Sequence, residues 1–183
     1  MCTDLGALRK AQAERDDQGE NDDADTVLLM PKHASDSSVQ IAAETTILTA
    51  LSKEIGTPFT QGVTLPVGAA HVRPDGVAAD ESAFVEIFAH IGKLKGGQRH
   101  KISTDALKLL ALREIRPNAR LILAFADGAA AASVSGWRAE TLKANGIEIH
   151  IVSLSTVDRA KIEAAQARQK MVNPPVESAE SGG

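Results

Sequence analysis

Arg73-Pro74-Asp75-Gly76 and Phe84-Val85-Glu86-Ile87-Phe88-Ala89-His90 are the two stretches that decide the fold expected for this chain. The second stretch is apolar apart from Glu86 and His90, which is typical of a buried β-strand. Between the two stretches, Asp80-Glu81-Ser82 has the composition of a polar turn. The pattern predicts two neighbouring strands, each of which carries one acid.

Working outward from this pair, the sequence predicts an alternation of helices and strands. A helix begins at Ser37 or Ser38 and ends before Gly56. Three successive strands follow as a meander, at Pro58–Leu65, His71–Ala79 and Ala83–Ile91. The remaining elements are a helix at Gln98–Glu114, a strand at Leu121–Ala126, a helix from its N-cap Asp127 to about Lys143, a strand at Ile147–Leu154 and a helix at Thr156–Lys170. Late strands that alternate with helices favour parallel pairing, so we expect an α/β fold with a mixed central sheet flanked by helices.

Glu44 falls on the side of the first helix that should face the core. It is in line with apolar residues three and four positions apart, namely Ile41, Ile47, Leu48, Leu51 and Ile55. An acid in this row is either functional, or extends to water at the border of the helix, or caps a neighbouring chain.

The two ends of the chain differ in composition from its middle. Residues 1–35 are rich in acidic and polar residues, and residues 172–183 include Pro174-Pro175 and a polar end. Neither segment can bury enough apolar surface to offset the entropy of ordering. We therefore expect an acidic, mostly disordered arm (1–35), one folded domain (36–171) and a disordered tail (172–183).

The single cysteine, Cys2, excludes an intrachain disulfide or a thiolate metal cluster. No apolar run reaches the length of about 20 residues that a membrane span requires, and the N-terminus lacks the order of a signal peptide. These features indicate a cytoplasmic protein without membrane association.

The net charge of −4 is unevenly distributed. Residues 1–25 hold eight acids and three bases, whereas the segment from Lys93 to Lys108 holds five bases and one acid, Asp105. A local excess of positive charge matters more for phosphate binding than the total charge does. The candidate nucleic-acid-binding residues are Lys93, Lys95, Gln98, Arg99 and Lys108, and the alternative is a solvated lysine-rich surface.

The chain resembles the PD-(D/E)XK nuclease superfamily, which has the restriction-endonuclease-like fold, over about residues 38–154. The resemblance rests on the order of helices and strands and on two motifs, Pro74-Asp75 and Glu86-Ile87-Phe88. In that family an aspartate at a strand bend and an acid in the next strand of a hairpin reach one metal ion. The resemblance implies Mg²⁺-dependent (or Mn²⁺-dependent) hydrolysis of DNA phosphodiester bonds. It also implies Asp75 and Glu86 as catalytic metal ligands, the Ile87 carbonyl as a further ligand and Glu44 as an accessory ligand.

The chemistry of the two acids supports this interpretation independently. Carboxylates from adjacent strands offer Mg²⁺ hard oxygen ligands, and the ion lowers the pKa of a bound water. A buried acid between Val85 and Ile87 is costly unless it is paired or bound to metal. The alternatives are that Glu86 faces water and that Pro74-Asp75-Gly76 is an ordinary turn.

The sequence departs from the family pattern at Phe88, which stands where the family has a lysine. Our first candidate for the missing catalytic cation is Lys101 on the following helix, and the second is Lys95. His90 shares a strand face with Glu86 and Phe88 and could act as a base or contact a phosphate. The absence of tyrosine and the scarcity of other aromatic residues argue against single-strand base stacking.

Two other functions remain open at this point. The chain could be a catalytically inactive nuclease-fold module that binds nucleic acid or a protein partner, which Phe88 favours. It could also be an interaction protein whose acidic residues 14–25 mimic nucleic acid or shield its own basic surface. A homodimer is expected if the protein cuts both strands of DNA.

Overall fold

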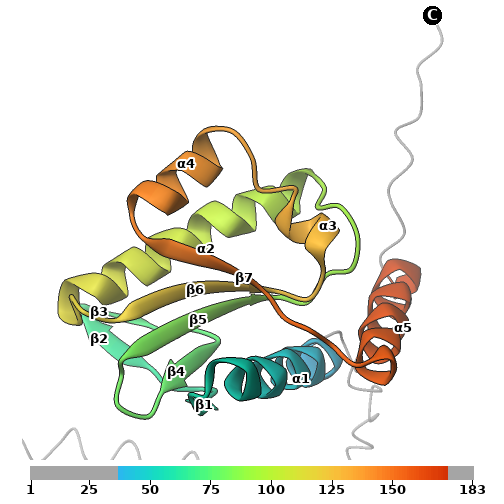
Figure 1. Ribbon diagram of the computed structural model, residues 1–183, viewed down its shortest axis with the longest axis horizontal. Helices are drawn as coiled ribbons and strands as arrows, with labels where there is room; N and C mark the ends of the chain where they lie inside the picture. Colours follow the sequence, from blue (N-terminus) through green and yellow to red (C-terminus); the bar gives the residue numbers. More distant parts are fainter. Residues whose placement is uncertain (1–36, 173–183) are drawn as a thin grey trace, which may run out of the picture. The chain divides into compact units, whose positions relative to one another are not determined.

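A computed structural model describes residues 37–172, and the centre of this region is a five-stranded mixed sheet with helices on both faces (Figure 1). The expected α/β class is therefore confirmed at this level. The arm predicted for residues 1–35 lies outside the described residues, as does the predicted tail except for Val172.

The sheet has the strand order β1-β4-β5-β6-β7. These strands are β1 (Phe59–Thr60), β4 (Gly76–Ala78), β5 (Ala83–Phe88), β6 (Arg120–Phe125) and β7 (Ile147–Ile151). β4 pairs antiparallel with β1 and β5, whereas β6 pairs parallel with β5 and β7. The parallel pairing expected for the late strands is confirmed.

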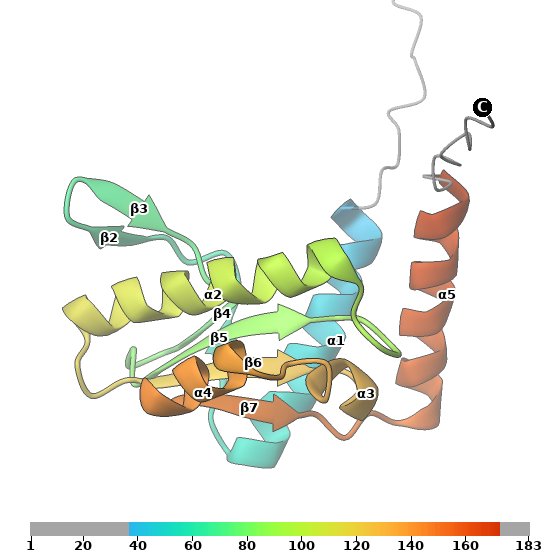
Figure 2. The same ribbon diagram turned by 90° about the horizontal axis from the view of Figure 1, so that it is seen from above.

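The predicted three-strand meander is wrong in its first two strands. Each of them is interrupted, so that β2 (Leu65–Val67) and β3 (Ala70–Val72) form a separate two-stranded hairpin. Gly62 and Gly68, with φ of 79° and 59°, supply conformations that other residues rarely adopt. Only β1 and β4 of the expected segments join β5 in the main sheet, and the hairpin extends away from it (Figure 2).

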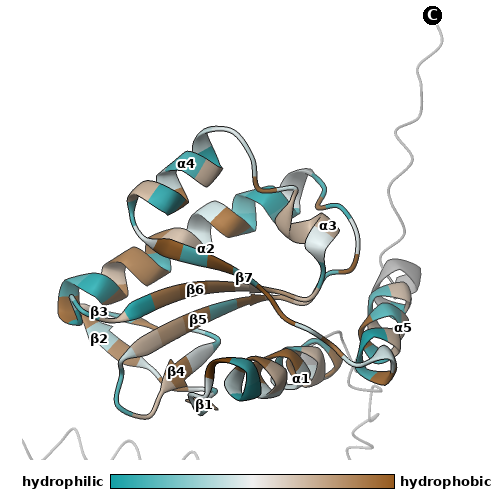
Figure 3. Ribbon diagram, viewed as in Figure 1, coloured by the Kyte–Doolittle hydropathy of each residue, from teal (hydrophilic) through white to brown (hydrophobic). Residues whose placement is uncertain are grey.

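Side chains alternate along β5 between two layers of the core. Phe84 and Phe88 pack on the face covered by α2 (Gly96–Ile115), α3 (Gly128–Ala131) and α4 (Trp137–Ala144). Val85 and Ile87 pack on the opposite face, against α1 (Ser37–Ile55) and α5 (Thr156–Val172). The strands between these layers are mostly hydrophobic (Figure 3). A continuous apolar strand is expected when both faces of a sheet are covered.

The helix ends agree with the sequence signals, with one exception. Asp127 caps α3 by accepting a hydrogen bond from the Ala129 N–H, but the helix predicted to continue to Lys143 is broken. Gly136, at φ 63°, separates α3 from α4, and α4 ends at Asn145-Gly146 as expected. None of the helices within residues 37–172 is long and apolar enough to cross a membrane.

Ile41 is the exception on α1. The other apolar residues of the predicted row pack into the core or against it, whereas Ile41 is 55% exposed. It lines a pocket with Gln61, Arg73 and Asp75.

Candidate functional site

Asp75 lies immediately before β4, and its side chain continues the hydrogen bonding between β4 and β5 beyond their last paired residues. The last paired residues are Gly76 and Val85, and beyond them the Ile87 N–H donates to Asp75 Oδ2 at 2.7 Å. The N–H and C=O of a residue in an extended strand point to the same edge. The Ile87 carbonyl therefore faces the edge on which the Asp75 carboxylate lies.

Gly76 fixes the distance between α1 and this end of β4. A Cβ at this position would lie 2.7 Å from Leu48 Cδ1, so that a larger residue would require the Leu48 side chain to move. The absence of a side chain lets α1 pack directly on the strand, and Glu44 is one helical turn before Leu48. The same contact that builds the core thus brings Glu44 towards Asp75.

Glu86 is completely buried on the α2 face of β5. Its Oε2 accepts from Lys108 Nζ at 2.5 Å, and its Oε1 is buried without a hydrogen-bond partner among the described residues. Burial, followed by the negative charge of Asp75, raises the pKa of Glu86 to about 8, against the effect of the Lys108 hydrogen bond. A buried carboxylate oxygen of this kind is suited to receive a proton or a cation.

Asp105 links two lysines on α2. It is 2% exposed, and its carboxylate contacts Lys101 Nζ at 2.5 Å and Lys108 Nζ at 3.1 Å. Positions three and four apart lie on one side of a helix, so Lys101, Asp105 and Lys108 form a single charged row. Burial alone would lower the pKa of Lys108, but its hydrogen bond to Glu86 and the charges of Glu86 and Asp105 raise it.

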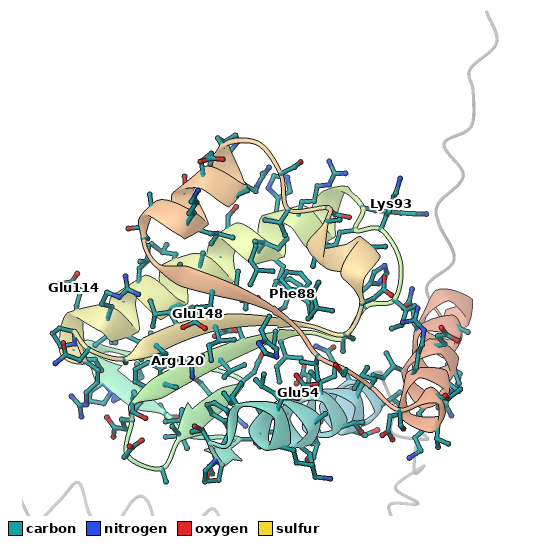
Figure 4. The ribbon with its side chains drawn as sticks, in the orientation of Figure 1. Glu54, Phe88, Lys93, Glu114, Arg120 and Glu148 are labelled. Carbon is teal, nitrogen blue, oxygen red and sulfur yellow. The ribbon has the colours of Figure 1, made fainter. Side chains whose placement is uncertain are left out.

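Lys101 also lies over Phe88, the residue found where the family pattern has a lysine. Its Nζ is 4.6 Å from the centroid of the Phe88 ring, which stacks on Phe125 with 4.9 Å between centroids. Phe88 lies between the sheet and α2 (Figure 4). Lys101, our first candidate for the missing catalytic cation, is therefore held beside Phe88 by a cation–π contact and by its ion pair with Asp105.

Glu44 stands between two pockets. Burial raises its pKa, the hydrogen bond from Gln40 (2.8 Å) opposes this shift, and the charge of Asp75 adds to it. On one side it borders the pocket of Ile41, Gln61 and Asp75, and on the other a pocket of about 160 Å³ that contains Lys101. Other residues that line the second pocket include Gln40, Ile87, Phe88, His90, Gln98 and Gln166.

We call Glu44, Asp75, Glu86, Lys101, Asp105 and Lys108 the charged cluster. Asp105 and Glu86 contact lysines of this cluster directly, and the charge of Asp75 raises the pKa of Glu44 and of Glu86. Among the four residues that the sequence suggested as catalytic, the charge of Asp75 acts on the pKa of both Glu44 and Glu86, and the charge of Lys101 acts on that of Glu44.

The predicted nucleic-acid-binding residues divide into two groups. Lys93, Lys95 and Arg99 are exposed around the start of α2, and Figure 4 shows Lys93 pointing away from the sheet. Gln98 instead holds local structure, because its side chain accepts from the Lys95 N–H at 2.9 Å and lies 3.0 Å from His90 Nδ1. Lys108 differs from the expectation, since its side chain points inward to Glu86 and Asp105.

Sequence reasoning missed the roles of Asp105 and Lys108. Their spacing from Lys101 was visible, but charged residues on one side of a helix usually face water. The signal that could have revealed them is Glu86, because an acid in an apolar strand requires a cation from the helix that covers that face.

Glu86 should give the folded protein a measurable dependence on pH. The raised pKa means that the folded state holds a proton between about pH 4.5 and 8 that the unfolded chain has released. The unfolding free energy should therefore fall as pH rises through this range, by up to about 1.4 kcal/mol per pH unit. Denaturant titrations of wild type and Glu86→Gln at several pH values measure this slope. Equal slopes in the two proteins would contradict the assignment.

A divalent ion would have only a small set of ligands here. Among the described residues, no group of three or more His, Cys, Asp and Glu side chains is arranged to hold one ion. The oxygen atoms that β5 and the residue before β4 offer are the Asp75 carboxylate, the unpaired Oε1 of Glu86 and the Ile87 carbonyl. Oxygen ligands of this type suit Mg²⁺, which usually keeps several of its waters.

Comparison of the chain with protein-family models, curated proteins and solved structures found no match in any of the three.

Proposed function

We propose that this protein is a metal-dependent nuclease with a PD-(D/E)XK-like core that hydrolyses phosphodiester bonds of DNA. The observation that carries the proposal is the hydrogen bond from the Ile87 N–H to Asp75 Oδ2. This bond holds the Asp75 carboxylate beside Ile87, the residue that follows Glu86. The negative charge of Asp75 in turn raises the pKa of Glu86. The strand order and the covering helices are compatible with the restriction-endonuclease-like fold.

Asp75, Glu86 and the Ile87 carbonyl would hold Mg²⁺ or Mn²⁺. When bound, such an ion lowers the pKa of a water molecule and offsets negative charge on the phosphate. Glu86 must release its proton to act as a ligand, and Lys108 favours the ionised form. Asp105 in turn keeps Lys108 and Lys101 in place by ion pairs to both.

Lys101 would supply the cation that Phe88 cannot. Its side chain is 43% exposed and borders the pocket that also contains Glu44 and Ile87, so a phosphate group can reach it. Lys93, Lys95 and Arg99 would contact the DNA backbone near the same end of α2, because phosphate contacts position the duplex without reading its sequence. The start of this helix would then face the substrate.

The experiment that tests the proposal is cleavage of plasmid and linear DNA with Mg²⁺ or Mn²⁺ by the wild type and by Glu86→Ala. We expect cleavage by the wild type only, and its loss on chelation of the metal. Equal activity of the two proteins would remove the assignment.

Replacement of Lys101 separates a catalytic cation from a DNA-binding one. We expect Lys101→Ala to lower kcat for DNA cleavage by about 100-fold, because a charge that stabilises the transition state is lost. Lys95→Ala should mainly weaken binding and raise KM. Steady-state kinetics on a short duplex measures both constants. An unchanged kcat in Lys101→Ala would exclude the catalytic role.

A catalytically inactive nuclease-fold module that binds nucleic acid or a protein partner is the second candidate. It is favoured by Phe88, whose ring is fixed in the core against Phe125 and leaves position 88 without a cation. Both nearby lysines are also paired with acids within the cluster.

Calorimetric titration with Mg²⁺ discriminates between the two candidates. A nuclease should bind the ion in a way that depends on Asp75 and Glu86, and more tightly as pH rises through 8, because Glu86 is then ionised. Binding should be lost in Asp75→Asn. An inactive module should show no heat that is sensitive to either residue, which would favour the second candidate.

A further inference from the structure

β7 is the last strand of the main sheet, and only β6 pairs with it among residues 37–172. In Figure 2 it runs along the open border of the sheet. An unpaired edge is a template for another strand, and proteins usually protect it with lysine, proline or a bulge. The sequence Ile147-Glu148-Ile149-His150-Ile151 contains neither lysine nor proline.

The backbone groups of β7 that have no partner strand among residues 37–172 belong to its three isoleucines. The Val152 N–H donates to Phe125 O of β6 at 2.9 Å. Because backbone groups of successive residues point to opposite edges, those of Ile151, Ile149 and Ile147 point away from β6. All three positions can therefore exchange hydrogen bonds with a new strand.

The isoleucine side chains also leave apolar surface uncovered. They share one face of the sheet, where Ile147 is buried in the core but Ile149 is 41% and Ile151 is 52% exposed. Glu148 and His150 share the other face. There Glu148 binds Arg120 at 2.8 Å and His150 binds Glu54 at 2.7 Å, and Glu148 and Arg120 lie on neighbouring strands in Figure 4.

We propose that β7 pairs antiparallel with β7 of a second copy of this chain, with the twofold axis at Ile149. This register places Ile149 opposite the partner's Ile149 and Ile147 opposite the partner's Ile151. It covers the exposed isoleucines and uses every outward-pointing backbone group of the strand. On the other face, Glu148 lies opposite the partner's His150.

Charge and strand length select this partner and this register. Four side chains then form one row across the two copies, in the order Arg120, Glu148, the partner's His150 and the partner's Glu54. Their charges alternate in sign when His150 is protonated. When His150 is neutral, no two neighbours in the row carry the same charge. An axis at Ile147 or Ile151 would extend the pairing beyond the ends of β7. The axis at Ile149 is the one that pairs all five residues of the strand. A strand that is complementary to itself in this way favours a second copy over an unrelated peptide.

The test is sedimentation of the full chain over a range of concentrations. We expect a monomer–dimer equilibrium for the wild type. Ile149→Lys should raise the dissociation constant by at least about 100-fold, because two isoleucines lose their contact and two lysines face each other at the axis. Leu107→Lys is the matched control, since Leu107 is also exposed (68%) but lies on α2, and it should dimerise like the wild type.

The register is tested by thiol cross-linking in a Cys2→Ser background. Ile149→Cys should form a covalent dimer with a short bis-maleimide, and Leu107→Cys should not. A monomeric wild type, a dimer that survives Ile149→Lys and Ile151→Lys, or equal cross-linking at both positions would overturn the proposal. The interface contains no residue of the charged cluster, so this result is independent of whether the protein cleaves DNA.

Discussion

Asp75→Asn is expected to lower the rate of Mg²⁺-dependent DNA cleavage by at least about 1,000-fold while the protein stays folded. Asparagine keeps an oxygen that can accept a hydrogen bond from the Ile87 N–H, so the link between the side chain at position 75 and β5 is retained. It removes the negative charge needed to hold the ion, whose contribution of several kcal/mol corresponds to a loss of this size. Single-turnover cleavage of a supercoiled plasmid measures the rate.

Asp80→Asn is the matched control for this substitution. Asp80 lies in the same hairpin and also accepts a backbone hydrogen bond, from the Ser82 N–H at 3.1 Å. It is exposed and outside the charged cluster, so its replacement should leave cleavage unchanged. Equal rates for Asp75→Asn and the wild type would exclude Asp75 as a ligand, and equal losses in both variants would indicate a general effect on the hairpin.

Lys108→Met is expected to lower the unfolding free energy by about 3–5 kcal/mol at pH 9, the usual cost of removing one partner from a buried ion pair. Glu86 then remains buried with neither oxygen paired, so it either carries an uncompensated charge or takes up a proton at a cost that grows with pH. The cost should shrink as pH falls, because the carboxyl group takes up a proton and no longer carries a charge. Denaturant unfolding at pH 9 and pH 6 measures the difference.

Two further variants identify the source of this effect. Glu86→Gln combined with Lys108→Met should recover a large part of the loss at pH 9, since position 86 no longer carries a charge and Asp105 keeps its ion pair with Lys101. Lys101→Met should cost no more than about 1 kcal/mol, because the Lys101 side chain is 43% exposed. If the double variant is as unstable as Lys108→Met, the lost packing of the lysine stem explains the result and the ion pair does not.

The spacing of apolar residues and the helix-capping residues correctly predicted several helices and strands. α1, β6 and α5 occur close to their expected positions, and Asp127 caps its helix. These features follow from the spacing of apolar residues and from capping chemistry, which act within a few residues. The proximity of Asp75 to β5 also followed from the expected pairing of adjacent strands.

The features that were not predicted depend on contacts between distant segments. The strands β2, β3 and β4 each combine one valine with a proline, alanine or glycine, so composition could not show that only β4 joins the main sheet. Lys108 is polar and lies on a helix, and only the position of α2 over β5 turns its side chain inward. The break before α4 was signalled by Gly136, but the alanine-rich run before it concealed the end of α3.

The hydrogen bond between Ile87 and Asp75 has a consequence for how descendants of this sequence could change. The side chain at position 75 accepts this bond whether or not it holds an ion, so a related protein without the proposed activity would still need a short acceptor there. Aspartate at this position is therefore weak evidence of the proposed activity in a homologue. Under the proposed function, asparagine at 75 or loss of the acid at 86 would mark homologues that retain the architecture without the chemistry.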